Sequence, residues 1–281
     1  MKNLNPYNDD PCSFLDDIIK TKRYSKKDPN YRIRLNVLIP NVKLYYNDYI
    51  NAHNINNHLS LSPSISDNQN KNDLLKLYSS KDKKLIEFKY SRTTVYDNRI
   101  KKICQYCTIN SCNTLDHIVP KEEYSEFAVN PLNLLPACSE CNSYKGKYWK
   151  KGGNRLFLNL YTDILPDEQY LFVDLIFNTN QIEIKFKLEN INGINSTLFN
   201  LICSHYSKLN LLNRFNTNSN EIISELIYQI KSFKNKLSIL DIKESILDQI
   251  KSNKKEFGYN YYKSILEETL INSDEFIIKY T

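Results

Sequence analysis

Residues 114–120 (TLDHIVP) place an acid and an imidazole side by side within an extended apolar run. On a strand, adjacent side chains point to opposite faces, so Asp116 and His117 could serve different sides of one reaction centre. The carboxylate of Asp116 and the amide oxygen of Asn142 are hard ligands of the kind that bind magnesium or manganese. His117 is the nearby residue whose unperturbed pKa lies close to neutrality, which makes it the candidate general base. Lys145, one helical turn after Asn142, is expected to contact phosphate.

These residue types together match the needs of one reaction. Hydrolysis of a phosphodiester bond requires a water nucleophile, a base that takes its proton, and positive charge on the phosphate as the transition state develops. The histidine, the two oxygen ligands and the lysine supply each of these. The sequence therefore predicts a metal-dependent enzyme that cuts nucleic acid.

Four cysteines flank this chemistry as two C-x-x-C pairs, Cys104 with Cys107 and Cys138 with Cys141. Such knuckles present four thiolates to one tetrahedral zinc ion, and a ligand set closed in this way leaves no position for water, so the zinc is expected to be structural. The alternatives are buried cysteines without metal, or a bare zinc ribbon that binds nucleic acid. Cys112 could substitute as a ligand or pack in the core, and the latter is expected for Cys12 and Cys203.

The interval between the knuckles is too long for a simple zinc ribbon, in which fifteen to twenty residues are usual. Residues 114–120 predict a strand, and residues 130–138 predict a loop that enters a second strand. A short helix is predicted over residues 139–146, with Ser139 as its cap and Gly146 at its end. The order strand, loop, strand, helix, clamped by zinc at both ends, would bring the candidate catalytic residues together.

The pieces CQYC, TLDHIVPK, NPLNLLPACSECN and the following Lys-Gly resemble the HNH endonuclease family. The resemblance implies a ββα-metal fold in which His117 is the first H and the general base. It implies that Asn133 is the middle N, which braces the loop and orients the histidine; Asn130 is a rival for this role. Asn142 stands at the final H as a metal ligand, and Asp116 is the acidic ligand. The implied activity is nicking or cutting of double-stranded DNA.

A weaker resemblance continues beyond this core, through residues 161–164 (YTDI) and 168–172 (EQYLF). These segments are similar to stand-alone HNH proteins found beside ATPase partners in bacterial anti-phage systems of the Septu type. The resemblance implies an ATPase partner and a role as the nuclease of a defence system. The competing function is a non-catalytic zinc module that binds nucleic acid or a partner protein.

The flanking sequence predicts an α+β fold that is mainly helical, with three segments at 1–100, 101–153 and 154–281. In the first segment a helix is expected after Ser13 as its cap, and the Asn- and Ser-rich stretch 54–73 predicts an exposed or mobile loop. In the third segment, residues 170–177 and 181–188 predict a β-hairpin around a turn at 178–180. Helices are expected over 196–281, with Asn218 and Glu221 as a capping signal.

Composition adds modest constraints. The chain of 281 residues has a formal net charge of +6 and is 41% hydrophobic, so it can bury a substantial core and its charge suits a polyanionic partner. No run approaches the length of a membrane span, and the seven cysteines suit a reducing compartment. We therefore expect a soluble cytoplasmic protein that acts on DNA without a membrane.

Overall fold

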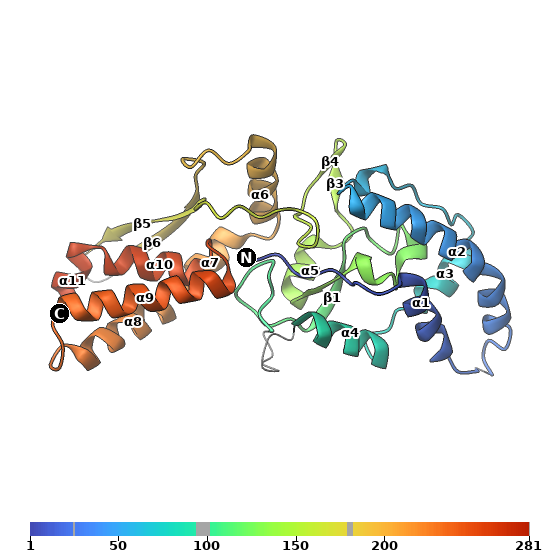
Figure 1. Cartoon of the computed structure of the whole chain (residues 1–281), viewed down its shortest axis with the longest axis horizontal. Helices are drawn as coiled ribbons and strands as arrows, with labels where there is room; N and C mark the ends of the chain where they lie inside the picture. The colour runs from blue at the N-terminus through green and yellow to red at the C-terminus, as the bar shows by residue number, and fades with distance from the viewer. Residues whose placement is uncertain (25, 94–101, 179–181, 281) are drawn as a thin grey trace. The chain divides into compact units, whose positions relative to one another are not determined.

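The computed structural model describes residues 1–24, 26–93, 102–178 and 182–280 (Figure 1). Within them it contains eleven α-helices and three two-stranded antiparallel sheets, which confirms the predicted α+β class. Contacts divide the chain into two compact units. The N-terminal unit comprises Asn3–Tyr106 and Asn110–Ile164, and the C-terminal unit comprises Met1–Lys2, Cys107–Ile109 and Leu165–Thr281.

The N-terminal unit begins with four helices: α1 (Pro11–Lys20), α2 (Tyr31–Asn54), α3 (Asn68–Leu75) and α4 (Lys83–Thr93). The sequence predicted Ser13 as the cap of α1, but the cap is Asp10. The Asp10 carboxylate accepts hydrogen bonds from the backbone N–H groups of Cys12 and Ser13, both at 3.0 Å. Pro11 has no N–H to satisfy and occupies the first helical turn, so the helix starts earlier than its apolar pattern suggested.

Residues 54–73, predicted as an exposed or mobile loop, contain the short 3-10 helix η1 (His58–Ser60) and most of α3. Asp67 caps α3 by accepting a hydrogen bond from the Asn70 N–H at 2.7 Å. Asp73 is fully buried and its carboxylate pairs with Arg34 of α2. Local capping and one long-range ion pair therefore order a stretch whose composition alone is typical of a loop.

The segment between the cysteine pairs folds in the predicted order. Strand β1 (Thr114–His117) pairs with β2 (Leu134–Ala137), with Thr114 opposite Ala137 and His117 opposite Leu134. The connection contains the 3-10 helices η3 (Ser125–Phe127) and η4 (Pro131–Asn133). Helix α5 (Ser139–Lys145) follows, and a small hairpin of β3 (Lys150–Lys151) and β4 (Asn154–Arg155) completes the region.

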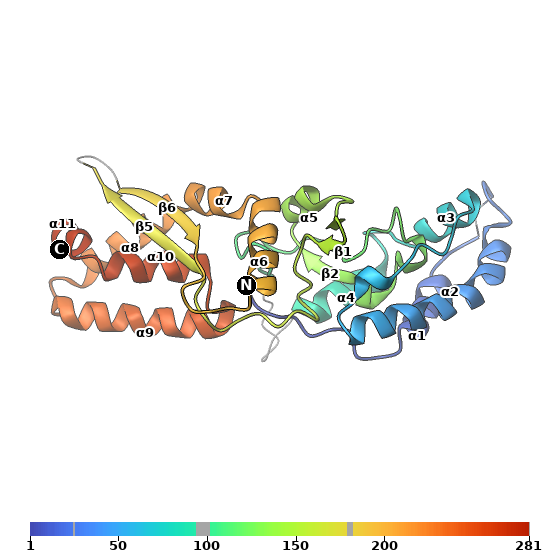
Figure 2. The ribbon, with the colours of Figure 1, turned by 90° about the horizontal axis from the view of Figure 1, so that it is seen from above.

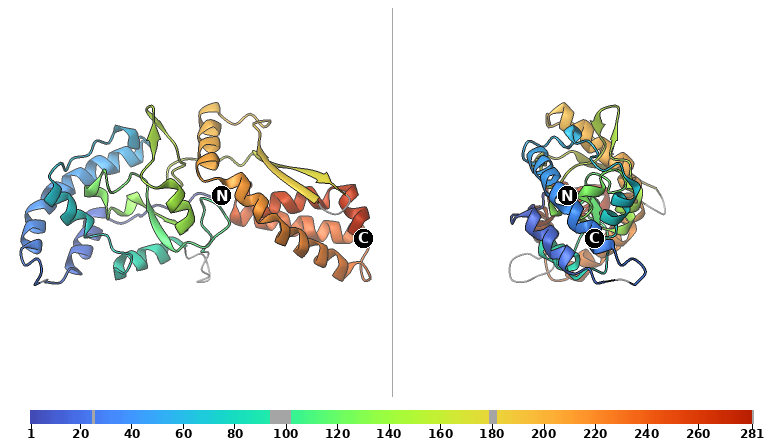
Figure 3. Two further views of the ribbon diagram at one scale, coloured as in Figure 1. Left: turned by 180° about the vertical axis from the view of Figure 1, so that it is seen from behind. Right: turned by 90° about the vertical axis from the view of Figure 1, so that its right-hand side faces the viewer.

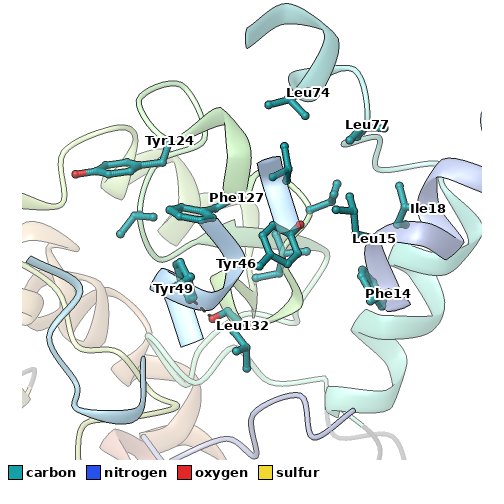
Figure 4. Close-up of a cluster of buried hydrophobic side chains, with 14 of the residues drawn as sticks. Phe14, Leu15, Ile18, Tyr46, Tyr49, Leu74, Leu77, Tyr124, Phe127 and Leu132 are labelled. Carbon is teal, nitrogen blue, oxygen red and sulfur yellow. Dashed lines mark hydrogen bonds between the residues drawn. The ribbon is translucent and has the colours of Figure 1, made fainter. Parts of the chain in front are cut away.

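The core of this unit lies between α2 and the β1–β2 connection (Figure 4). Val42, Tyr46 and Tyr49 are completely buried on one face of α2, at the spacing of successive helical turns. Phe127 meets this face, with its ring centroid 4.9 Å from that of Tyr49 and 6.3 Å from that of Tyr46. Because each large apolar side chain contributes about 1.5–3 kcal/mol on burial, this contact fixes the connection that precedes β2.

The C-terminal unit combines a hairpin with helices (Figure 2). Strands β5 (Leu171–Phe177) and β6 (Ile182–Leu188) pair as predicted, whereas residues 179–181, in the predicted turn, lie outside the described residues. Phe215 stacks on Tyr262 at 4.5 Å, and Phe186 of β6 meets Phe215 edge-on. The helices are α6 (Ser196–Lys208), α7 (Leu211–Thr217), α8 (Ser219–Phe233), α9 (Ile239–Phe257), α10 (Tyr262–Ile271) and α11 (Asp274–Tyr280).

The caps of these helices differ in part from the prediction. Asn218 precedes α8, but its side chain makes no cap and donates instead to the Arg214 carbonyl oxygen at 2.7 Å. Ser238 and Asp241 form a full capping box at the start of α9. Among the described helices, none has both the length and the apolar character that crossing a bilayer requires.

Candidate metal centre and active site

The four knuckle cysteines meet in the structure. The sulfur atoms of Cys104, Cys107, Cys138 and Cys141 are buried and all lie within 4.8 Å of one another. The Cys138 sulfur accepts the Cys141 N–H, and the Cys107 sulfur accepts the Ile109 N–H, both at 3.4 Å. Buried thiolates with N–H donors are the donor set that zinc prefers, so the residues present fit a structural zinc ion.

Side chains join the two knuckles independently of any metal. Asn110, after the first knuckle, donates to the Glu140 carboxylate in α5 at 2.7 Å. Asn113 accepts the Ser139 N–H at 2.7 Å at the start of the same helix. Cys112 is buried outside the four-sulfur cluster, as expected for a packing residue. A metal held by the four sulfur atoms would therefore act on the same junction between β1 and α5 as these hydrogen bonds.

His117 ends β1 with its ring buried. Its Nε2 lies 2.9 Å from the Ala128 carbonyl oxygen. A carbonyl can only accept, so Nε2 carries the proton of the neutral ring, and Nδ1 carries the lone pair that a general base needs. Burial lowers the pKa of His117 to about 3, against the opposing effect of the Ala128 carbonyl, which keeps the ring neutral. The Tyr78 ring packs edge-on against it at 4.7 Å.

Asn133 is completely buried and joins both ends of the β1–β2 connection. Its Oδ1 accepts the Val119 N–H at 2.8 Å, and its Nδ2 donates to the carbonyl oxygens of Val119 and Phe127, both at 3.1 Å. Phe127 directly precedes Ala128, whose carbonyl holds the His117 ring. Asn133 therefore bonds to the residue next to Ala128, whose carbonyl oxygen fixes the histidine tautomer. Asn130, the rival, caps η4 by accepting the Leu132 N–H at 3.1 Å.

Asp116 points away from His117, as adjacent strand residues must. Its Oδ2 accepts the Tyr106 hydroxyl at 3.0 Å and its Oδ1 pairs with the Lys145 ammonium at 3.1 Å. All three side chains are buried. Burial raises the pKa of Asp116, although Lys145 and Tyr106 both oppose this. The carboxylate thus already has a cation and a hydroxyl as partners.

Lys145 differs from its predicted placement. It was expected to contact phosphate, but only 2% of it is exposed, and besides Asp116 it donates to the His117 carbonyl oxygen. The physical reason is that Asp116, buried on the face of β1 that meets α5, requires a counter-charge from that helix. In this structure Lys145 bonds to Asp116 and His117 of β1, and contact with a phosphate would require the Lys145–Asp116 ion pair to open.

Asn142 lies one turn earlier on α5 and is half-buried. Its amide Nδ2 donates weakly to the Thr114 hydroxyl, at 3.4 Å. Among the described residues, no hydrogen bond joins Asn142 to Asp116 or His117. The structure therefore places Asn142 beside the strand that carries Asp116, without a direct contact between the two expected metal ligands.

Three tyrosines that support the site were absent from the predicted set. Tyr106 lies inside the first knuckle and bonds to Asp116, and Tyr78 donates to the Leu115 carbonyl oxygen at 3.0 Å while packing on His117. Tyr49 of α2 donates to the Asn133 Oδ1 at 3.1 Å. The position of Tyr106 between the two cysteines was a usable signal. Tyr49 and Tyr78 are distant in sequence, and no local pattern marks them.

With this geometry established, comparison with known proteins identifies one domain. Residues 104–148 match the sequence model of the HNH endonuclease family. The match covers the four cysteines, both strands and α5. It supports a nuclease with metal binding, and the four-cysteine cluster and His117 both lie within the matched residues.

Two curated proteins are similar to longer parts of the chain. One is Protein ea31 of Escherichia phage lambda, 27% identical over 200 residues, or 65% of this chain and 67% of that protein. The other is Flagellar hook-associated protein 1 of Buchnera aphidicola, 34% identical over 149 residues, or 50% of this chain and only 26% of that protein. No solved structure matches the chain significantly.

Proposed function

We propose that the HNH endonuclease module at residues 104–148 hydrolyses phosphodiester bonds of DNA with His117 as its general base. The observation that carries the proposal is the hydrogen bond from the His117 Nε2 to the Ala128 carbonyl oxygen, inside a segment that matches a nuclease family. This bond leaves the basic lone pair on Nδ1, and a neutral imidazole with a fixed tautomer is what proton abstraction from water requires.

The other residues take supporting roles in this proposal. Asn133 is a positioning residue, because it holds the segment whose carbonyl orients His117. Asp116 and Asn142 would hold a magnesium or manganese ion, and their oxygen donors fit the chemistry of a hard divalent cation. When bound, such an ion supplies positive charge to the phosphate. For Asp116 to serve as a ligand, its carboxylate must exchange the Lys145 ammonium for the ion.

The zinc ion is structural in this proposal. Four sulfur ligands complete a tetrahedral shell, so no position remains for a water nucleophile or a phosphate oxygen. Its role is to fix β1, β2 and α5 relative to one another. The two metals therefore differ in both ligands and task, and chelators of different strength should separate their effects.

The test is the His117→Ala variant, assayed on supercoiled plasmid with magnesium or manganese. Loss of a general base lowers the rate by about 100-fold to 10,000-fold, so we expect cleavage to fall by at least about 100-fold. Zinc content and circular dichroism should match those of the parent protein. Parallel assays on linear DNA and RNA define the substrate.

Two results would contradict the proposal. Undiminished cleavage by His117→Ala would remove the histidine from the mechanism. Retarded migration of DNA by the parent protein, without loss of full-length substrate under any metal, would support the alternative of a non-catalytic zinc module. Added imidazole provides a further check, because restored cleavage by the alanine variant would assign the missing function to the ring itself.

The cytoplasmic setting, the ATPase partner and the role in anti-phage defence remain predictions from the sequence alone. Purification of the tagged chain from its native host, followed by identification of bound proteins, tests the partner. Recovery of an ATPase would support the prediction, and recovery of the chain without one would contradict it.

A further inference from the structure

A continuous stretch next to the candidate site carries unbalanced positive charge. From Asn142 to Thr162 the sequence contains five basic residues and no acidic residue. Two of the five are neutralised within the protein, since Lys145 pairs with Asp116 and Arg155 pairs with Asp163 at 2.6 Å. The remaining three are Lys147, Lys150 and Lys151, all of them exposed.

These three lysines have little internal compensation. Lys150 lies 3.9 Å from the Glu123 carboxylate, near the limit for an ion pair, and donates to the Tyr124 hydroxyl at 3.2 Å. Within the described part of the chain, Lys147 and Lys151 take part in no ion pair. Exposed cations without counter-ions are available to an external anion.

The three lysines lie on or beside the hairpin of β3 and β4, which projects from the N-terminal unit (Figures 1 and 3). We call residues 147–155 the basic hairpin. Its register places Lys150 opposite Arg155 and Lys151 opposite Asn154. Because Asp163 already neutralises Arg155, the facing strand offers no carboxylate to Lys150 or Lys151.

The tip of the basic hairpin is narrow. Gly152 and Gly153 form its two-residue turn, both with positive φ, at +57° and +77°. No atom lies within 4 Å of a Cβ built at either glycine. The tip therefore has no side chain and meets no obstacle, so it can approach another backbone closely.

The base of the basic hairpin is attached to the segment that orients His117. Trp149 is buried and meets the Tyr124 ring edge-on at 5.9 Å. Tyr124 in turn stacks on Phe127 at 6.3 Å, and Phe127 precedes Ala128, the residue that holds the histidine ring. The exposed lysines are thus held on a rigid support, next to the connection that completes the candidate site.

We propose that the basic hairpin binds the phosphate backbone of duplex DNA, with Lys147 and Lys151 as the contacts and the glycine tip directed into a groove. A two-stranded ribbon is narrow enough to enter a groove of duplex DNA, and flanking lysines then meet phosphates. This inference rests on the proposed function, because it names the element that grips the substrate of the same module.

The test is the double variant Lys147→Ala/Lys151→Ala, measured by fluorescence anisotropy with a labelled duplex at several salt concentrations. Magnesium and manganese are left out of the buffer, so the DNA stays intact. No chelator is needed, so the protein keeps its structural zinc. Each lost phosphate contact reduces the slope of log K against log salt by about 0.9, so the double variant should lose about 1.8. At moderate salt its Kd should rise by about tenfold.

The matched control is Lys231→Ala/Lys236→Ala, which removes two exposed charges from the C-terminal unit. A fall in slope for the hairpin variant alone supports the proposal. An unchanged slope, or an equal fall in the control, overturns it. An equal loss on single-stranded DNA or on RNA of the same length also overturns the assignment to duplex DNA.

The same variants separate this inference from the nuclease proposal. Cleavage by the parent protein with an unchanged binding slope for the hairpin variant would reject the hairpin and leave the nuclease intact. A reduced slope, in a protein that cuts no substrate, would support the hairpin and reject the nuclease.

Discussion

Asn133 uses its full hydrogen-bonding capacity inside the protein. Its Oδ1 accepts from the Val119 N–H and the Tyr49 hydroxyl, while its Nδ2 donates to the carbonyl oxygens of Val119 and Phe127. A buried amide satisfied at every position has one stable orientation. The residue thus acts through geometry, by holding the connection between β1 and β2 closed around His117.

The hydrogen bond from Tyr49 to Asn133 can be removed by a single substitution, which tests the role of Asn133. The Tyr49→Phe variant removes one donor to Asn133 and leaves that oxygen with a single partner. We expect a loss of about 1–2 kcal/mol in the free energy of unfolding, measured by urea denaturation, together with slower cleavage of DNA.

Tyr46 supplies a matched control on the same helix. Both tyrosines are completely buried, but the Tyr46 hydroxyl has no hydrogen-bond partner among the described residues. Removing that hydroxyl should therefore leave stability unchanged or raise it, with cleavage unaffected. Equal losses for Tyr46→Phe and Tyr49→Phe would show that the Tyr49 hydrogen bond has no special role.

The buried pair of Asp116 and Lys145 gives a second prediction at this scale. Lys145→Met leaves the buried Asp116 carboxylate without its counter-charge, with the Tyr106 hydroxyl and the His117 backbone as its remaining partners, so the free energy of unfolding should fall by about 3–5 kcal/mol. Adding Asp116→Asn to this variant removes the unpaired charge and should recover much of the loss. Urea denaturation of zinc-loaded protein measures both.

An exposed pair serves as the comparison. Lys251 and Asp248 form an ion pair in which both side chains are about three-quarters exposed, at 74% and 75%. Lys251→Met should change stability by less than about 1 kcal/mol. If Lys145→Met also changed the free energy of unfolding by less than about 1 kcal/mol, the buried pair would not be the main source of stability on this face of β1.

At the scale of elements, α5 is held against β1 by side-chain pairs that match in spacing. Asn142 contacts Thr114 and Lys145 contacts Asp116, so three residues along the helix correspond to two along the strand. The rises are about 4.5 Å for the helix and about 6.8 Å for the strand, a difference that flexible side chains can span. A helix of seven residues is too short to be stable alone, so these contacts must hold it, together with any metal bound by the four cysteines.

Helix α10 carries a group that makes stability depend on pH. Burial raises the pKa of Glu267 from its ordinary value of 4.5 to about 7, with Glu225 adding to the shift and Lys263 opposing it. The folded state therefore keeps this proton over a range where the unfolded chain has lost it. Stability from this group is complete below about pH 4.5 and is lost as the pH rises through 7.

Glu267→Gln removes that dependence. We expect the variant and the parent to be about equally stable at pH 5, and the variant to be more stable at pH 8 by on the order of 1–3 kcal/mol. Glu244→Gln, on an exposed position of α9, controls for the loss of one surface charge. Urea denaturation at both pH values checks this, and parallel curves for Glu267→Gln and the parent would contradict it.

At the scale of the whole molecule, the four-cysteine cluster joins the residues that lie farthest apart in the sequence of the module. It joins cysteines at 104–107 to cysteines at 138–141, and the two strands lie between them. Four buried thiols brought this close without a metal would lose solvation with little return. Zinc binding should therefore supply folding free energy directly.

Zinc content and thermal stability test this point together. We expect about one zinc per chain in the parent and in Cys112→Ser, and loss of zinc in Cys138→Ser. The free energy of unfolding of the zinc-free protein should be lower by several kcal/mol, so its Tm should fall by roughly 10 °C. Retention of zinc by Cys138→Ser, or a loss by Cys112→Ser equal to it, would place the ion elsewhere.

Local pattern was enough to predict much of this protein. The C-x-x-C pairs, the order of strands and helix in the module, the β5–β6 hairpin and the mixed α+β class all follow from spacing and periodicity within short windows. Patterns of this kind are local because they express the geometry of one turn, strand or helix. The structure differs from these local patterns in the cap of α1 and in the helical order of residues 58–60 and 68–73, since a cap or a buried ion pair can override composition.

Tertiary structure decided what the site residues contact. No spacing could indicate that Lys145 pairs with Asp116, that Tyr49 of α2 reaches Asn133, or that the Ala128 carbonyl selects the His117 tautomer. These contacts join residues from separate elements, so they depend on how the elements pack and not on any one of them. The sequence alone indicated which side chains could take part in the chemistry. The burial of Asp116 in the folded protein determined that the Lys145 ammonium lies against it.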